Sequence, residues 1–142
     1  MNTTTEISKT QNGLRNYAIV IIGLLVIQYA LGMVTNMFVQ FPDTSDVGQL
    51  WEFTRSQLPS GAHMWVGVLL VLSAIIFVIQ SAIKKNRSWI VSSVVGLVAI
   101  MTAFYGGVMF VSSQVDAYSM VMALAFIVAF LAYGWGLYAD RG

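Results

Sequence analysis

The chain alternates between long apolar stretches and short polar segments. Four stretches are predominantly apolar and carry no Asp, Glu, Lys or Arg in their interior: about 17–39, 61–83, 88–111 and 118–139. A helix needs about 20 residues to cross a hydrocarbon core of about 30 Å. The strands of a membrane barrel would be about 10 residues long and would alternate in polarity, which these stretches do not do. The pattern therefore predicts an all-α membrane protein, an antiparallel bundle of four transmembrane helices.

Basic residues in the polar segments predict the orientation. Six of the seven fall on one side of the predicted threading: Lys9, Arg15, Lys84, Lys85, Arg87 and Arg141. Only Arg55 falls on the other side. Cytoplasmic loops carry the excess of Lys and Arg, so both termini and the 84–87 turn are predicted to be cytoplasmic in a bacterial-type plasma membrane. The expected organisation is a disordered polar tail over 1–16, one transmembrane domain over 17–139 and a cytoplasmic end at 140–142.

The first external loop, about 41–60, has a helical pattern of its own. Apolar residues recur at helical spacing between Pro42 and Pro59: Val47, Leu50, Trp51 and Leu58. This pattern is typical of a short amphipathic helix that lies in the membrane interface, with Trp51 as its anchor. The alternative is an ordered loop that caps the bundle.

Composition narrows the function classes. Of 142 residues, 58% are hydrophobic and 9% are charged, too few charges for the surface of a soluble domain. Cysteine is absent, which excludes disulfides and thiolate metal sites, and the net charge of +1 gives no basis for nucleic-acid binding. No residue constellation demands catalysis. The expected partners are the lipid bilayer and either further copies of the chain or a larger membrane complex.

Small and amide residues recur along one face of each predicted helix, where small side chains let helices approach closely in a membrane. The spacing of these residues is seven in the second helix and three or four in the others. They are Gln28, Gly32, Asn36 and Gln40; Ser60, Gly67, Ala74 and Ser81; Ser92, Gly96, Ala99, Ala103 and Gly107; and Ala125, Ala129, Ala132 and Gly136. An unpaired amide is costly in hydrocarbon, so Gln28 and Asn36 are expected to face the bundle.

The candidate ligand-binding residues gather in the external half. His63, the only histidine, lies about one turn below the external surface. Its imidazole suits ligation of haem iron or copper, or a hydrogen bond to a quinone carbonyl; the alternative is a structural bond to a backbone carbonyl or to Asp116. Asp116 is otherwise expected to cap the fourth helix. Tyr105, beside Gly106 and Gly107, marks a place where a flat ligand or a neighbouring helix can approach.

Methionine is also concentrated in the external half. Six methionines fall there: Met33, Met37, Met64, Met109, Met120 and Met122. Thioether sulfur binds Cu(I) and serves as an axial haem ligand. The alternative is that these flexible side chains fill gaps in the core.

The run His63-Met64-Trp65-Val66-Gly67, early in the second span, resembles one half of a haem A synthase. That resemblance implies a four-helix bundle in which histidines of the second and fourth helices hold haem. Here the fourth helix has no histidine and offers Met120 or Met122 instead. The family's loop cysteines and the acidic residue of its first span are also absent. The chain is equally similar to small bacterial four-span membrane proteins.

The leading prediction is a non-enzymatic binding protein for a hydrophobic or redox cofactor, with haem the first candidate. The residues predicted to form its externally facing pocket are His63, Asn36, Met37, Tyr105, Met120 and Met122, with His63 as the metal ligand. The alternatives are an accessory or assembly subunit of a larger membrane complex, and copper handling through Met33, Met37, Met64 and His63.

Overall fold

Five helices make up the part of the chain that the structure describes. The computed structural model covers the backbone of residues 3–140 and, from residue 12 onward, the side chains. The helices are α1 (Thr3–Phe38), α2 (Val47–Ser56), α3 (Leu58–Ile83), α4 (Arg87–Ser113) and α5 (Asp116–Ala139), with no strand in the described residues. All but α2 are long and apolar enough to cross a membrane, as predicted. Arg141 and the side chain of Lys9, both used to predict orientation, lie outside the described parts.

The helix boundaries differ from the predicted spans at three places. α1 begins at Thr3, so the segment predicted to be disordered is helical as far as it is described. Proline is absent from this segment, so nothing in it forces the helix to end. α3 includes Pro59 in its first turn. Backbone N–H groups in the first turn of a helix have no acceptor within the helix, so the N–H that proline lacks costs no hydrogen bond. Val115, not Asp116, is the N-cap of α5; Asp116 lies in the first turn, where its charge is favourable.

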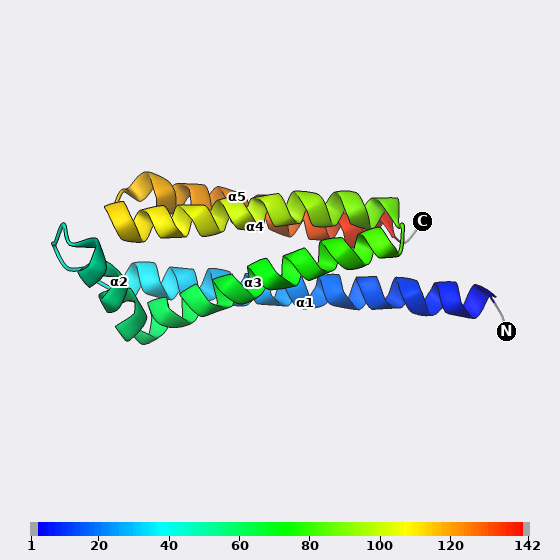
Figure 1. Ribbon diagram of the computed structural model, residues 1–142, viewed down its shortest axis with the longest axis horizontal. Helices are drawn as coiled ribbons and strands as arrows, with labels where there is room; N and C mark the ends of the chain where they lie inside the picture. Colours follow the sequence, from blue (N-terminus) through cyan, green and yellow to red (C-terminus); the bar gives the residue numbers. More distant parts are fainter. Residues whose placement is uncertain (1–2, 141–142) are drawn as a thin grey trace.

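The four long helices form a ring in which each packs against two others. The contacts join α1 to α3, α3 to α4, α4 to α5 and α5 to α1 (Figure 1). The start of α1, the α3–α4 turn and the end of α5 lie at one end of the bundle, here called the basic end because it carries Arg15, Lys84, Lys85 and Arg87. α2 and the α4–α5 turn lie at the other end, called the α2 end. The predicted antiparallel pairing of neighbouring helices is confirmed.

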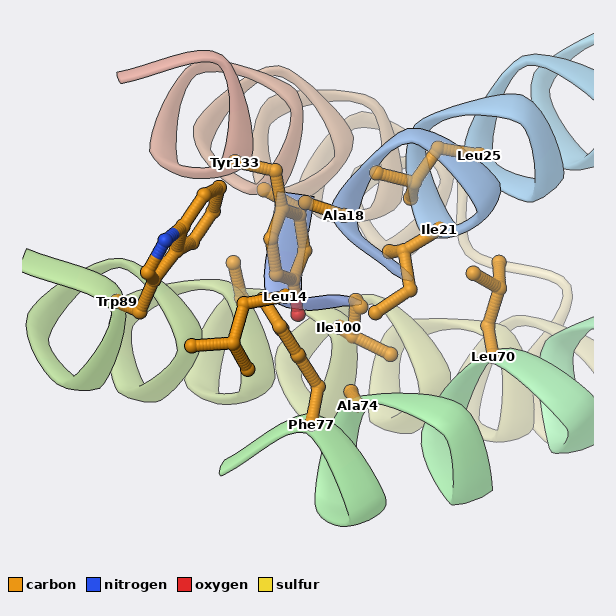
Figure 2. Packing of buried hydrophobic residues seen from close by; sticks show 12 residues of the cluster. Leu14, Ala18, Ile21, Leu25, Leu70, Ala74, Phe77, Trp89, Ile100 and Tyr133 are labelled. Atoms are coloured by element: carbon orange, nitrogen blue, oxygen red, sulfur yellow. The ribbon is translucent and has the colours of Figure 1, made fainter. Parts of the chain in front are cut away.

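The tightly packed core lies in the half of the bundle nearer the basic end (Figure 2). One aromatic side chain from each long helix meets there, with Phe77 of α3 in the middle. The Phe77 ring centroid is 5.4 Å from that of Tyr17, 5.5 Å from that of Trp89 and 5.9 Å from that of Tyr133. Phe77, Trp89 and Tyr133 are completely buried, so this aromatic cluster joins all four helices.

Glycines in α4 and α5 make room for the large members of that cluster. A Cβ atom at Gly96 would lie 2.7 Å from Cε2 of Tyr133, and one at Gly136 would lie 2.6 Å from Cζ3 of Trp89. Because Gly136 has no side chain, Ser92 can also approach the Ala132 carbonyl one turn earlier. The Ser92 hydroxyl donates a hydrogen bond to Ala132 O at 2.6 Å. The predicted small-residue faces of α3, α4 and α5 are confirmed near the basic end, where their members are buried: Ala74, Ser81, Ser92, Gly96, Ala99, Ala129, Ala132 and Gly136.

Polar side chains fasten the basic end. The Asn86 side-chain oxygen caps α4 by accepting the Trp89 backbone N–H at 3.2 Å. Its amide nitrogen donates to Asp140 Oδ1, also at 3.2 Å. Asn86 thereby ties the α3–α4 turn to the end of α5.

The α2 end is closed by the helix predicted in the first loop. Asp46 caps α2 by accepting the backbone N–H of Gly48 at 2.8 Å, while Leu50 and Thr54 are buried beneath the helix. The Ser60 hydroxyl, at the start of α3, donates to Thr54 O at 2.7 Å. The helix and its capping position are therefore confirmed, whereas its place in the membrane interface stays a prediction.

Candidate binding site around His63

His63 is held by Gln28, across the interface between α3 and α1. The imidazole Nδ1 lies 3.1 Å from the Gln28 backbone oxygen, and Nε2 lies 3.3 Å from the Gln28 amide nitrogen. The carbonyl can only accept, so Nδ1 carries the proton and Nε2 accepts from the amide. One neutral tautomer satisfies both bonds. Of the two structural bonds expected for His63, to a backbone carbonyl or to Asp116, the structure contains the first, and the carbonyl is that of Gln28.

Two glycines let this pair form. A Cβ at Gly32 would lie 3.0 Å from Cε1 of His63, and one at Gly67 would lie 3.2 Å from Nε2 of Gln28. Gly32 is four residues after Gln28 and therefore lies beside the carbonyl that His63 uses. α1 thus supplies Gln28 and, four residues later, Gly32, against which His63 packs. In the same way, α3 supplies His63 and, four residues later, Gly67, against which Gln28 packs. We call these four residues the His63–Gln28 clasp.

The clasp leaves one acceptor without a partner. Gln28 Oε1 is buried and has no hydrogen bond within the described chain. Gln28 lies 13 residues beyond Arg15, or about 20 Å along the helix, so it falls inside a hydrocarbon layer of about 30 Å. An unpaired polar atom at that depth is costly.

The interior between the core and the α2 cap is only partly closed. Asn36 follows Ala18 by 18 residues, about five helical turns, and lies at the edge of the inward face of α1, next to Thr35, whose hydroxyl oxygen is buried. Ala18 is completely buried, whereas Asn36 is exposed. Tyr29, about three turns after Ala18, is 51% exposed.

The other three long helices also become less buried toward the α2 end. Phe104 follows the buried Ile100 by one turn of α4 and is 40% exposed. His63 lies two turns before the buried Leu70, and Phe126 about one turn before the buried Ala129; both are half-buried. We call Tyr29, Asn36, His63, Phe104 and Phe126 the open layer. In Figure 1, α3 runs obliquely, near α4 at the basic end and beside α1 and α2 at the other.

The structure separates most of the other predicted site residues from His63. Asn36, which was expected to face the bundle, is exposed. Met37, Tyr105 and Met120 are 67%, 61% and 65% exposed. Met122 instead packs over α4, where a Cβ at Gly106 would lie 3.1 Å from its Cγ. The close approach predicted at the Gly106–Gly107 pair is therefore made by a neighbouring helix.

Among the predicted ligands, only His63 is placed so that it could coordinate haem iron. A ligating histidine usually donates its other ring N–H to a carbonyl or carboxylate, as Nδ1 does here. Its Nε2 carries the lone pair that would meet iron, once the Gln28 amide moves away. Neither methionine of α5 supplies a second ligand, because Met120 is exposed and Met122 is turned to α4. The described residues also hold no group of three or more His, Cys, Asp or Glu side chains suited to a metal ion.

A separate hollow of about 600 Å³ lies at the α2 end, and its lining does not include His63. It is lined by Phe41, Pro42, Asp43, Thr44, Ser45, Leu50, Ser112, Ser113 and Gln114. The hydroxyls of Ser112 and Ser113 donate to the backbone of α4. The lining of this hollow is part polar and part apolar, and it contains none of the residues of the predicted pocket.

Sequence reasoning missed the aromatic cluster and its two unpaired polar atoms. Trp89 Nε1 and Tyr133 OH are buried without a hydrogen-bond partner in the described chain. The sequence feature that could have indicated this cluster is the presence of Gly96 and Gly136 opposite the large aromatic residues Tyr133 and Trp89 on the facing helix. Comparison with protein-family models, with curated proteins and with solved structures finds no match to this chain. The resemblance to haem A synthase therefore has no family match behind it.

Proposed function

We propose that the chain is a non-enzymatic, multi-pass membrane protein that binds an apolar, membrane-dissolved molecule in the open layer. Its basic end faces the cytoplasm of a bacterial-type plasma membrane, because Lys and Arg are retained on that side. The α2 end then faces outward, and the molecule enters from the outer half of the bilayer.

The observation that carries this proposal is the change in burial along one face of α1. Ala18 and Leu25 are 0% and 3% exposed, whereas Gly32, at the next seven-residue step of the same row, is only half-buried, and Tyr29 and Asn36 at the edge of that row are exposed. A bundle that served only to anchor α2 would gain stability by closing this layer with larger side chains, since protein interiors are packed to high density. Aromatic side chains and methionine line binding sites for apolar ligands in many proteins.

Two tryptophan substitutions test the proposal. Asn36→Trp places a large ring in the open layer, whereas Val34→Trp places the same ring on the opposite face of α1, which is already 40% exposed. Protein is purified in mild detergent, extracted with organic solvent and analysed by mass spectrometry. The wild type and Val34→Trp are expected to carry about one equivalent of an apolar molecule, and Asn36→Trp much less. Equal amounts of ordinary phospholipid in all three would contradict the proposal.

Haem is the first specific candidate for the bound molecule. Support comes from the neutral tautomer of His63, whose Nε2 is available once Gln28 moves. Purified protein titrated with haem should then develop a Soret band that His63→Ala abolishes. An unchanged titration in His63→Ala would contradict ligation by His63. Copper handling has less support, because Met33 and Met37 are exposed on α1.

A second candidate function, an accessory subunit of a larger membrane complex, is supported by the same exposure. A transmembrane helix of a partner would cover the open layer as well as a small molecule would. Under that reading a stoichiometric partner chain copurifies in mild detergent and Asn36→Trp releases it. Copurification of an apolar molecule without a partner chain favours the first function.

A further inference from the structure

One hydrogen-bonding atom of the clasp has no partner. The two side chains offer two acceptors, His63 Nε2 and Gln28 Oε1, and the two N–H groups of the Gln28 amide nitrogen. The amide nitrogen is placed against Nε2 at 3.3 Å, and Oε1 is left buried without a partner. The missing partner is therefore a donor.

The orientation of the Gln28 amide is fixed by its neighbour. Nδ1 of His63 faces the Gln28 backbone carbonyl at 3.1 Å and must carry the proton of the neutral ring. Nε2 is then an acceptor, so turning the amide over would set Oε1 against another acceptor. A neutral His63 thus keeps Oε1 pointed away from itself and short of a donor.

We propose that the polar group of the apolar ligand is a hydroxyl, which donates to the acceptors of the His63–Gln28 clasp. This inference rests on the proposed function and names the class of ligand: an apolar molecule with an O–H group, such as a quinol. A quinone, or another ligand whose polar atoms are carbonyl oxygens, would bring no donor to Gln28 Oε1.

The position of the clasp agrees with this ligand class. His63 belongs to both the clasp and the open layer, so a ligand whose apolar body lies in the layer reaches the buried Gln28 Oε1 when the Gln28 side chain turns toward it. The aromatic side chains of the layer, Tyr29, Phe104 and Phe126, come from the other three long helices, and the rings of Tyr29 and Phe126 stack with their centroids 5.1 Å apart. Gly32 and Gly67 keep bulk away from the pair itself.

Duroquinol and duroquinone form a matched pair of probes, because they share one carbon skeleton and differ in having hydroxyl or carbonyl groups. Each is titrated anaerobically into the intact wild-type protein in bicelles, labelled with ¹⁵N-histidine. The chain has one histidine, so its Nε2 signal reports on the clasp alone. We expect saturable duroquinol binding that shifts this signal, with an affinity about ten-fold or more above that for duroquinone.

Variants separate the hydroxyl contact from general apolar binding. Gln28→Leu is expected to lose the preference for duroquinol, and Val34→Leu, on the opposite face of α1, to keep it. The wild-type comparison stands even if Gln28→Leu fails to fold. Equal binding of both probes, or a preference retained in Gln28→Leu, overturns the hydroxyl assignment and leaves the proposed function standing. No saturable binding of either probe, together with no copurified apolar molecule, overturns both.

Discussion

Replacing Gly96 by alanine tests the packing that joins α4 to α5. The added Cβ would lie 2.7 Å from both Cε2 and the hydroxyl oxygen of Tyr133, well inside van der Waals contact. Tyr133 is completely buried beside Phe77, so its ring has no free space to enter. The helix backbones must separate instead.

The size of the effect follows from two opposing contributions. Overpacking a well-filled interior costs about 1–3 kcal/mol. Alanine improves helix propensity over glycine by up to about 1 kcal/mol. We therefore expect Gly96→Ala to lower the free energy of unfolding by about 1–2 kcal/mol.

Unfolding in mixed micelles with increasing SDS, followed by circular dichroism, measures this change. Gly134→Ala is the matched control, because a Cβ at Gly134 meets nothing within 4 Å and should be neutral or slightly stabilising. The double variant Gly96→Ala with Tyr133→Leu should recover part of the loss, since the clash is with the ring. Equal stability of Gly96→Ala and Gly134→Ala would refute the reasoning.

Four further outcomes follow from the hydrogen bonds and the threading. Ser92→Ala removes the bond to Ala132 O and should cost about 0.6–1.7 kcal/mol in the same unfolding assay, whereas Thr102→Ala, on the exposed face of α4 and bonded only within its own helix, should cost less. Asn86→Ala removes the cap of α4 and the bond to Asp140 and should cost about 1 kcal/mol, more than Asp140→Ala; an equal loss would mean that the cap contributes nothing. The ¹⁵N spectrum of His63 at neutral pH should show the proton on Nδ1, and a proton on Nε2 would contradict the clasp as described. Because the chain has no cysteine, Lys85→Cys and Ser45→Cys can be labelled singly in intact cells; Ser45→Cys should react with an impermeant maleimide and Lys85→Cys should not.

Apolar periodicity was sufficient to predict the four long helices, their antiparallel order and the short helix in the first loop. The small-residue faces were predictable near the basic end, because Ser92, Gly96 and Gly136 pack there against the opposite helix as membrane helices generally do. Near the α2 end the same reasoning expected Asn36 to face the bundle, whereas Asn36 is exposed. Whether a ring of helices closes depends on their crossing angles, which residue spacing along one helix does not determine.

The partners of His63 illustrate the same limit. The sequence singled out His63 and Gln28 separately, and only the alignment of α1 against α3 brings them together with Gly32 and Gly67. The aromatic cluster was missed because Tyr17, Phe77, Trp89 and Tyr133 lie on four different helices and share no spacing.

A photo-crosslinking residue at position 36 tests most directly whether the open layer holds a specific apolar molecule. Benzoylphenylalanine is incorporated at position 36 or, on the opposite face, at position 34, and the cells are irradiated before purification. Intact-protein mass spectrometry should find at position 36 an adduct of one small molecule that is absent at position 34, where only bulk lipid is captured. Identical lipid adducts at both positions, or a crosslinked protein at position 36, would contradict the account.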